Sequence, residues 1–307
     1  MPLEIRSDQR SRGRRAASAC PRPPRGSDDS AAAPPLPSAQ WFAAVRRAAL
    51  RWFARHARDL PWRQNSDAYA VLVSEAMLQQ TQVKTVIPYF GRFIERFPTL
   101  QSLAAASLDD VLRLWQGLGY YRRAKNLLAA AKAIISEHDG RIPSDPAKLL
   151  GLPGIGRYTA GAIASLAFGV RAPVLDGNVK RVLSRLDGLS DANGPAAIKG
   201  LWARAEAILP CDQVGQFNSA LMELGATVCG PNQPACARCP VRAHCRARSL
   251  TPARSRSIGR GSMRKPSAPL RLARRWVFCV TSAGHWLIER RPDTGRWAGL
   301  WQFPTIP

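Results

Sequence analysis

Apolar residues recur every three or four positions along most of the chain between Trp41 and Leu209, the spacing that lines one face of an α-helix. Gly, Pro and Asn separate these periodic segments, and few stretches alternate apolar and polar residues as half-buried strands do. The pattern therefore predicts an all-α domain. The expected helices span residues 41–56, 68–78, 83–97, 108–118, 122–138, 157–168 and 178–186.

The sequences that flank this domain differ from it in composition. Residues 1–39 are rich in Pro, Ser and Arg, which predicts a disordered extension. Residues 249–271 lie in an acid-free stretch and form a basic linker, which either follows a phosphate backbone or is a passive tether. Within residues 272–307 two strand-like segments meet at the turn 282–284. They predict the beginning of a second domain that the chain does not complete.

The charge of the chain is strongly positive. With 45 Lys and Arg against 21 Asp and Glu, the formal net charge is +24. This excess favours a polyanionic partner, DNA or RNA first and an anionic membrane second, although a solvated basic surface without a partner has the same composition. No apolar run approaches the ~20 residues that cross a bilayer, so we expect no membrane association.

The N-terminus lacks an apolar secretory segment, which predicts a cytoplasmic protein. A mitochondrial targeting signal is the alternative, because the extension is rich in Arg, Ala and Ser. Its four acidic residues, Glu4, Asp8, Asp28 and Asp29, weigh against that alternative, since such signals are poor in acids.

Residues 144–168 predict a helix, a tight turn with the sequence LPGIG, and a second helix. Ser144 is the expected cap of the first helix, with Pro146 near its start. Gly154 and Gly156 lack a Cβ, so the turn can bring its backbone close to a surface. The N–H groups at the start of the second helix suit a phosphate of any base sequence. An ordinary corner between two helices is the alternative interpretation.

Four cysteines gather in the loop 229–245, at Cys229, Cys236, Cys239 and Cys245. Thiolates are soft ligands that favour zinc or an iron–sulfur cluster. Structural zinc sites usually present two close ligand pairs, whereas only Cys236 and Cys239 form such a pair here. A compact loop around a [4Fe–4S] cube therefore fits this spacing better.

Two acidic residues are candidates for chemistry. Glu75 has Leu72 and Leu78 three positions away on either side, which predicts burial on the apolar face of its helix and a raised pKa, as a general acid needs. A helix-edge Glu that reaches solvent is the alternative. Asp176 precedes the helix 178–186, where it can act as an N-cap and stay ionised. A protonated acid with an ionised carboxylate is the pairing that glycoside cleavage uses.

Together these segments resemble the helix-hairpin-helix DNA glycosylase superfamily, and specifically the adenine DNA glycosylase (MutY) family. The resemblance runs from about Trp41 to the end of the chain. It implies a mostly α, two-lobed helix-hairpin-helix fold over residues 40–248 with a [4Fe–4S] loop, followed by the start of a Nudix-like α/β domain. The matching motifs are LPWR (60–63), SEAMLQQTQV (74–83), WQGLGYYRRAKNL (115–127), LPGIGRYTAGAI (152–163), VLDGNVKRV (174–182) and the cysteine loop.

The resemblance implies removal of adenine mispaired with 8-oxoguanine or guanine in double-stranded DNA, after the base is flipped out. Glu75 then protonates the leaving adenine, and Asp176 stabilises the oxocarbenium ion or binds the sugar transiently. Asn178 supports this centre and Tyr158 helps to organise it. A monomeric, nucleoid-associated enzyme is expected. The DNA contacts implied by the motifs are the wedge residues Gln80 and Tyr120, with Arg63, Leu152, Gly154 and Gly156.

Tyr158 bears on the type of reaction. The related endonuclease III group carries a Lys at this position as a Schiff-base nucleophile, and a phenol cannot supply that chemistry. The sequence thus favours a monofunctional glycosylase. The alternatives are a bifunctional pyrimidine-damage glycosylase/lyase and a non-catalytic iron–sulfur protein that binds DNA. The Nudix-like domain that reads 8-oxoguanine in the family is represented only by its beginning, which leaves discrimination of the opposite base open.

Overall fold

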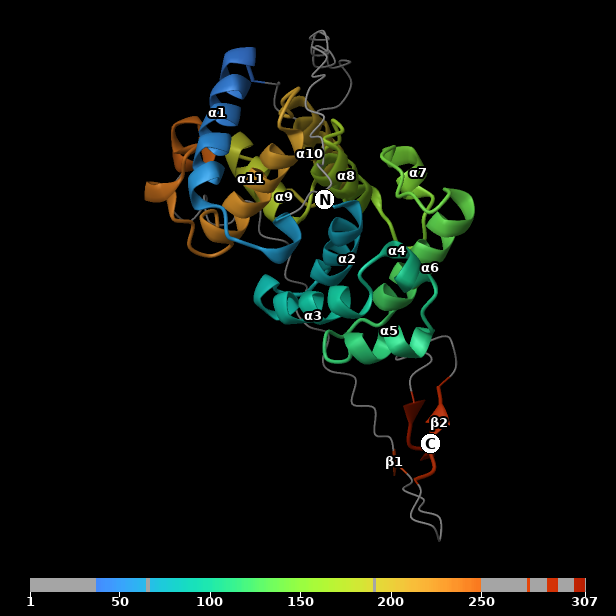
Figure 1. Ribbon diagram of the computed structural model, residues 1–307. Helices are drawn as coiled ribbons and strands as arrows, with labels where there is room; N and C mark the ends of the chain where they lie inside the picture. The colour runs from blue at the N-terminus through green and yellow to red at the C-terminus, as the bar shows by residue number, and fades with distance from the viewer. Residues whose placement is uncertain are drawn as a thin grey trace, which may run out of the picture.

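Helices make up most of the described chain in the computed structural model, as the apolar spacing predicted (Figure 1). The structure describes residues 37–64, 67–189, 192–249, 275–276, 286–291 and 301–306. The helices are α1 (Ala39–His56), α2 (Ala68–Leu78), α3 (Val83–Arg96), α4 (Leu100–Ala104), α5 (Leu108–Trp115), α6 (Arg122–Glu137), α7 (Pro146–Leu150), α8 (Arg157–Phe168), α9 (Gly177–Asp187), α10 (Pro195–Ala207) and α11 (Val214–Thr227).

Two hydrophobic cores divide the helical domain into two lobes, in agreement with the predicted two-lobed fold. The first core is built by α2 to α8 and contains large side chains such as Phe93 and Trp115. The second is built by α1 and α9 to α11 and contains Phe217 and Leu183. Helix α8 belongs to both, because Ile163 packs into the first core and Ala162 into the second. Figure 1 shows α1, α9, α10 and α11 on one side and α3 to α6 on the other.

Aspartates cap α2, which carries Glu75, and α9, which begins directly after Asp176. Asp67 accepts hydrogen bonds from the N–H groups of Tyr69 and Ala70 at the start of α2, and Asp176 caps α9. The expected cap of α7 was wrong by one residue. Asp145, and not Ser144, accepts the N–H of Ala147 at 2.9 Å. Both residue types cap well, and Pro146 at N1 puts Asp145 in the cap position.

The apolar pattern missed the short α4 and the two helices α10 and α11. Helix α11 carries polar residues that are buried, among them Asn218 and Glu223, so its apolar face is interrupted. Asn218 donates to Oγ of Ser165 and to the carbonyl oxygen of Ala172, both at 2.9 Å. Buried polar residues that are hydrogen-bonded interrupt the apolar spacing, so the spacing alone does not reveal this helix.

Among the residues described near the C-terminus, four two-residue strands occur. β1 (Arg275–Trp276) pairs antiparallel with β4 (Thr305–Ile306), and β2 (Glu289–Arg290) pairs with β3 (Trp301–Gln302). The expected turn at 282–284, the extension before residue 37 and most of the basic linker lie outside the described residues. The predicted domain boundaries therefore stay predictions. Among the described helices, none is both long and apolar enough to cross a membrane.

Candidate active site

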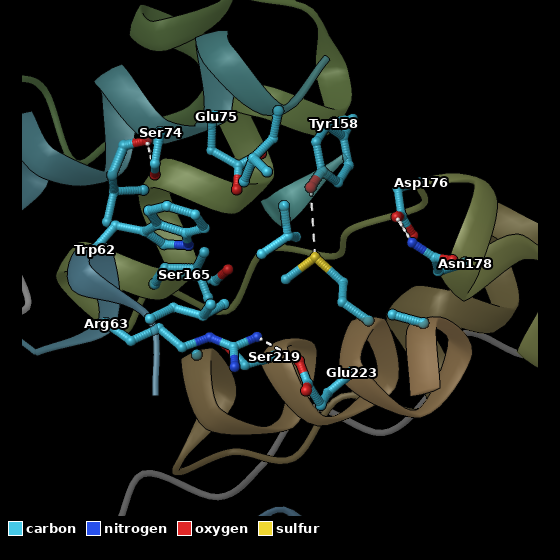
Figure 2. A pocket seen from close by; sticks show the side chains of 18 of the residues that line it. Trp62, Arg63, Ser74, Glu75, Tyr158, Ser165, Asp176, Asn178, Ser219 and Glu223 are labelled. Atoms are coloured by element: carbon cyan, nitrogen blue, oxygen red, sulfur yellow. Dashed lines mark hydrogen bonds and ion pairs between the residues drawn. The ribbon is translucent and has the colours of Figure 1, made fainter. Parts of the chain in front are cut away.

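A cavity of about 840 Å³ opens between the two lobes. Side chains of α2, α8, α9 and α11 point into it (Figure 2). Its size is within the range of small-molecule pockets, about 300–1,000 Å³. The structure brings Glu75, Tyr158, Asp176 and Asn178 together here, although Glu75 and Asp176 are a hundred residues apart in the chain. The lining also includes Arg63 and Gln80.

Glu75 lies on the inner face of α2 and is only 6% exposed, as its apolar flanks predicted. Burial raises the pKa of its carboxyl group to about 7, and the charge of Asp176 raises it as well. A hydrogen bond from Tyr158 and the charge of Arg63 act in the opposite direction. Glu75 can therefore carry a proton near neutral pH, which a general acid requires.

Asp176 is held in place by two hydrogen bonds. The N–H of Val179 donates to Oδ1 at 2.7 Å, and Nδ2 of Asn178 donates to Oδ2 at 2.8 Å. Asn178 is in turn fixed by Arg181, which donates to Oδ1 of Asn178 and to the carbonyl oxygen of Cys229, each at 2.8 Å. Helix α9 thus presents an oriented carboxylate to the cavity and is attached to the cysteine loop.

Tyr158 lies between the two carboxylates (Figure 2). It belongs to the first turn of α8, directly after the LPGIG turn. Burial raises the pKa of its phenol well above the usual value, and the charges of Glu75 and Asp176 raise it further. The hydroxyl contacts Sδ of Met222 at 3.4 Å. Tyr158 is therefore a neutral donor beside Glu75 and no nucleophile.

Glu223 is a cavity residue that the sequence did not indicate. Its side chain is fully buried on α11, where it binds Nε of Arg58 at 2.6 Å and a terminal nitrogen of Arg63 at 2.8 Å. Burial alone would raise the pKa of Glu223, but the hydrogen bonds and charges of both arginines outweigh burial and hold it below its usual range. Arg63, expected to bind DNA, faces the cavity beside Glu223.

We expect Glu223→Gln to lower the free energy of unfolding at pH 7 by about 2 kcal/mol, because two half-buried guanidinium groups lose their counterion. The depressed pKa gives stability that is present above pH 4.5, the usual value, and is lost as pH falls through the folded-state pKa. Urea unfolding at pH 7 and pH 4 measures both effects. The exposed Glu206→Gln serves as control, and an equal loss at both pH values would contradict the prediction.

Gln80 and Tyr120 have unusual backbone conformations. Both are non-glycine residues with positive φ angles, 58° and 49°, and both are exposed, Tyr120 by 63%. Gln80 follows α2 at the rim of the cavity, and Tyr120 ends the loop before α6. Such conformations cost free energy and cluster at functional sites.

The LPGIG turn joins α7 to α8. Gly154 has a φ of 74°, and a Cβ there would lie 2.5 Å from Cβ of Asn126, so only glycine fits. Gly156 faces open space, and no side chain caps the first turn of α8. The N–H groups of that turn therefore remain free for an anion. The side chain of Leu152 is 4% exposed and packs in the first core, so a DNA contact there would involve its backbone.

None of the four loop cysteines is in a disulfide, and they lie close enough to influence one another's ionisation. Burial raises the pKa of Cys239 to about 11, and the charges of the other three thiols raise it as well. Arg185 donates to Sγ of Cys229 at 3.3 Å. Within the described part of the chain, no three His, Cys, Asp or Glu side chains form a group suited to a metal ion.

The helical lobes, the hairpin and the carboxylate-lined cavity place the protein in the class of helix-hairpin-helix DNA repair proteins, and the family comparison names the same class. Residues 73–204 match the family described as HhH-GPD superfamily base excision DNA repair protein. The adenine DNA glycosylase of Mycolicibacterium smegmatis is 48% identical, over 65% of this chain and 68% of the relative. The chain belongs to the adenine DNA glycosylase family.

Two further similarities define the extent of this relationship. The mouse adenine DNA glycosylase is 39% identical over 86% of this chain, and the chain spans 60% of the length of that relative. A solved structure of a thermostable thymine-DNA glycosylase is 29% identical, with a TM-score of 0.63, and covers 68% of this chain and 97% of the other. The chain therefore spans less than two thirds of the mouse protein.

Proposed function

We propose that this protein is a monofunctional DNA glycosylase that removes adenine mispaired with 8-oxoguanine or guanine. The observation that carries the proposal is the pairing of a buried, protonatable Glu75 with a doubly hydrogen-bonded Asp176 across one cavity. Membership of the adenine DNA glycosylase family supports adenine as the base. The cavity volume of about 840 Å³ is ample for a flipped purine nucleotide.

In this reaction one carboxyl group acts as the acid and the other stabilises the positive charge on the sugar. Glu75 transfers its proton to a ring nitrogen of adenine as the N-glycosidic bond breaks, and the bonding electron pair leaves with the base. The sugar becomes an oxocarbenium ion, whose positive charge faces the carboxylate of Asp176. Water then adds to C1′, and Glu75, now ionised, accepts the proton that the water releases.

Binding to the duplex requires groups outside the cavity. The free N–H groups of the first turn of α8, next to Gly156, suit a phosphate of either strand and any sequence. Gln80 at the rim of the cavity and the exposed Tyr120 act as wedges that occupy the space vacated by the flipped base. Arg63, which Glu223 holds at 2.8 Å, supplies a charged donor for hydrogen bonds to the base edge.

Single-turnover assays on duplexes with A opposite 8-oxoguanine, A opposite G, T opposite G, and thymine glycol test this proposal. We expect adenine release from the first two duplexes without a borohydride-trappable adduct, since Tyr158 has no amine. Release of thymine or thymine glycol alone would overturn adenine as the substrate. A trapped covalent adduct would overturn the monofunctional assignment.

We further propose that Cys229, Cys236, Cys239 and Cys245 hold a [4Fe–4S] cluster. The proposal rests on the donor chemistry and not on a preformed site: four thiols share one loop, and Arg185 and backbone N–H groups donate to the sulfurs. The cluster would anchor the loop against α9 and supply no step of base removal. About four irons per chain are expected in an anaerobic preparation. One zinc per chain without iron would overturn this assignment.

We infer that the enzyme acts as a monomer on double-stranded DNA and is associated with the nucleoid in the cytoplasm. The net charge of +24 supports DNA as the partner. Light scattering of the complex with a short mispaired duplex should give one chain per duplex. Two chains per duplex would contradict the monomer.

A further inference from the structure

Arg123 lies at the base of the two loops that carry Gln80 and Tyr120. One loop, residues 79–81, follows α2, and the other, residues 117–120, precedes α6. Arg123 is the second residue of α6, and only 8% of it is exposed. The charged side chain is therefore inside the protein, where an arginine is costly to place unless its donors find partners. Both terminal nitrogens find partners, whereas the buried Nε has no hydrogen-bond partner among the described residues.

The guanidinium group of Arg123 spans both loops. One terminal nitrogen donates to the carbonyl oxygens of Ala76 at 3.2 Å, Met77 at 2.7 Å and Gln79. The other donates to Oγ1 of Thr81 at 3.1 Å and to the carbonyl oxygens of Leu118 at 3.3 Å and Gly119 at 3.2 Å. The planar fork of an arginine can reach two segments at once, whereas a lysine ammonium is a single point charge.

No carboxylate among the described residues forms an ion pair with Arg123. Its charge is instead balanced by carbonyl oxygens, several of them at the C-terminal end of α2, where the helix dipole favours a cation. The guanidinium also lies 5.6 Å from the ring centroid of Tyr120 and 5.5 Å from that of Trp115. Arg123 thus lies against the ring of Tyr120 and binds the residue on each side of Gln80, through the carbonyl oxygen of Gln79 and the hydroxyl of Thr81.

The same helix supports the DNA-facing hairpin. Asn126, one turn after Arg123, packs against Gly154 of the LPGIG turn so closely that a Cβ at Gly154 would lie 2.5 Å from Cβ of Asn126. The first two turns of α6 therefore form a common base for the hairpin and both wedge loops. The strained conformations at Gln80 and Tyr120 need such a base, since neither residue type favours a positive φ.

We propose that Arg123 is a positioning residue that couples the two wedge loops, so that Gln80 and Tyr120 enter the duplex as one unit and drive extrusion of the target base. The inference rests on the proposed function, because it takes the two exposed side chains as wedges. Arg123 does not reach the cavity, so its effect falls on extrusion and leaves bond cleavage unchanged.

Extrusion can be measured apart from excision with 2-aminopurine at the target position opposite 8-oxoguanine. We expect Arg123→Lys and Arg123→Met to slow the fluorescence rise by roughly tenfold, the effect of losing hydrogen bonds on both loops. Arg122→Met removes the same charge from the exposed neighbouring residue and should change the rate by less than about twofold. Unchanged extrusion in both Arg123 variants would overturn the proposal.

A double-mutant cycle distinguishes a loss of coupling between the two loops from a loss of stability alone. In the unsubstituted background, the effects of Gln80→Ala and Tyr120→Ala on extrusion should be non-additive, and in Arg123→Lys they should become additive. Thr81→Val, which removes one acceptor and keeps the side-chain shape, tests the contact in a chain that stays folded, and it should slow extrusion to a lesser degree. Equal coupling between the two substitutions in both backgrounds would overturn the proposed role of Arg123. Failure of the unsubstituted chain to release adenine would instead overturn the proposed function.

Discussion

Excision of adenine by Glu75→Gln is expected to be slower by about 10²–10⁴-fold in single-turnover assays, because the variant has no proton to give to the leaving base. Glutamine keeps the size of the side chain and needs no burial of a charge, so binding to the mispaired duplex should be retained. Gel-shift affinity and the excision rate, measured on the same duplex, separate the two effects.

The pH dependence of the unsubstituted chain tests the same role. Since burial raises the pKa of Glu75 to about 7, the fraction of protonated acid falls as pH rises through that value, and the excision rate should fall with it. Glu95→Gln removes an exposed acid from α3 and should leave the rate and its pH profile unchanged. A rate that is independent of pH between 5 and 9, or undiminished turnover by Glu75→Gln, would remove Glu75 from the mechanism.

Asp176→Asn should lower the excision rate by about 10²–10³-fold, the usual effect of removing one electrostatic contact to a charged transition state. Asparagine caps a helix as well as aspartate does, so α9 and the thermal stability of the protein should be preserved. The single-turnover rate and the melting temperature, measured together, distinguish the loss of charge from damage to the helix.

Asp67→Asn is the matched control for this variant. Asp67 caps α2 through the same kind of hydrogen bonds and does not line the cavity. It should therefore leave excision unchanged. If Asp176→Asn keeps full activity, the carboxylate does not stabilise the oxocarbenium ion. The role of Asp176 at the site would then be that of a helix cap alone.

Local sequence was sufficient to predict much of the fold. The apolar spacing that predicted the helix 68–78 also predicted the burial of Glu75, because Leu72 and Leu78 share its face. The positions of Gly154 and Asp176 predicted the turn and the cap of α9 for the same local reason. In α11 this reasoning failed, since Asn218 and Glu223 are buried with partners from other helices.

The two loops that carry Gln80 and Tyr120 illustrate a second limit of the sequence. Neither Gln80 nor Tyr120 is a residue that favours a positive φ, and their neighbours give no signal for it. Arg123, which is 43 residues from Gln80, donates hydrogen bonds to the carbonyl oxygens of Gln79 and Gly119, directly before the two residues. Backbone strain imposed from elsewhere in the chain leaves no local pattern to recognise.

The helical class, the hairpin, the cysteine loop and the two candidate carboxylates could be recognised without coordinates, because each follows from neighbours within a few residues of the chain. The folded arrangement of the helices was needed to see that Glu75 and Asp176 share one cavity and that Glu223 is held there by Arg58 and Arg63. It was also needed to see that burial raises the pKa of Glu75 to about 7. Desolvation and charge pairing depend on distances between side chains that the fold alone brings together.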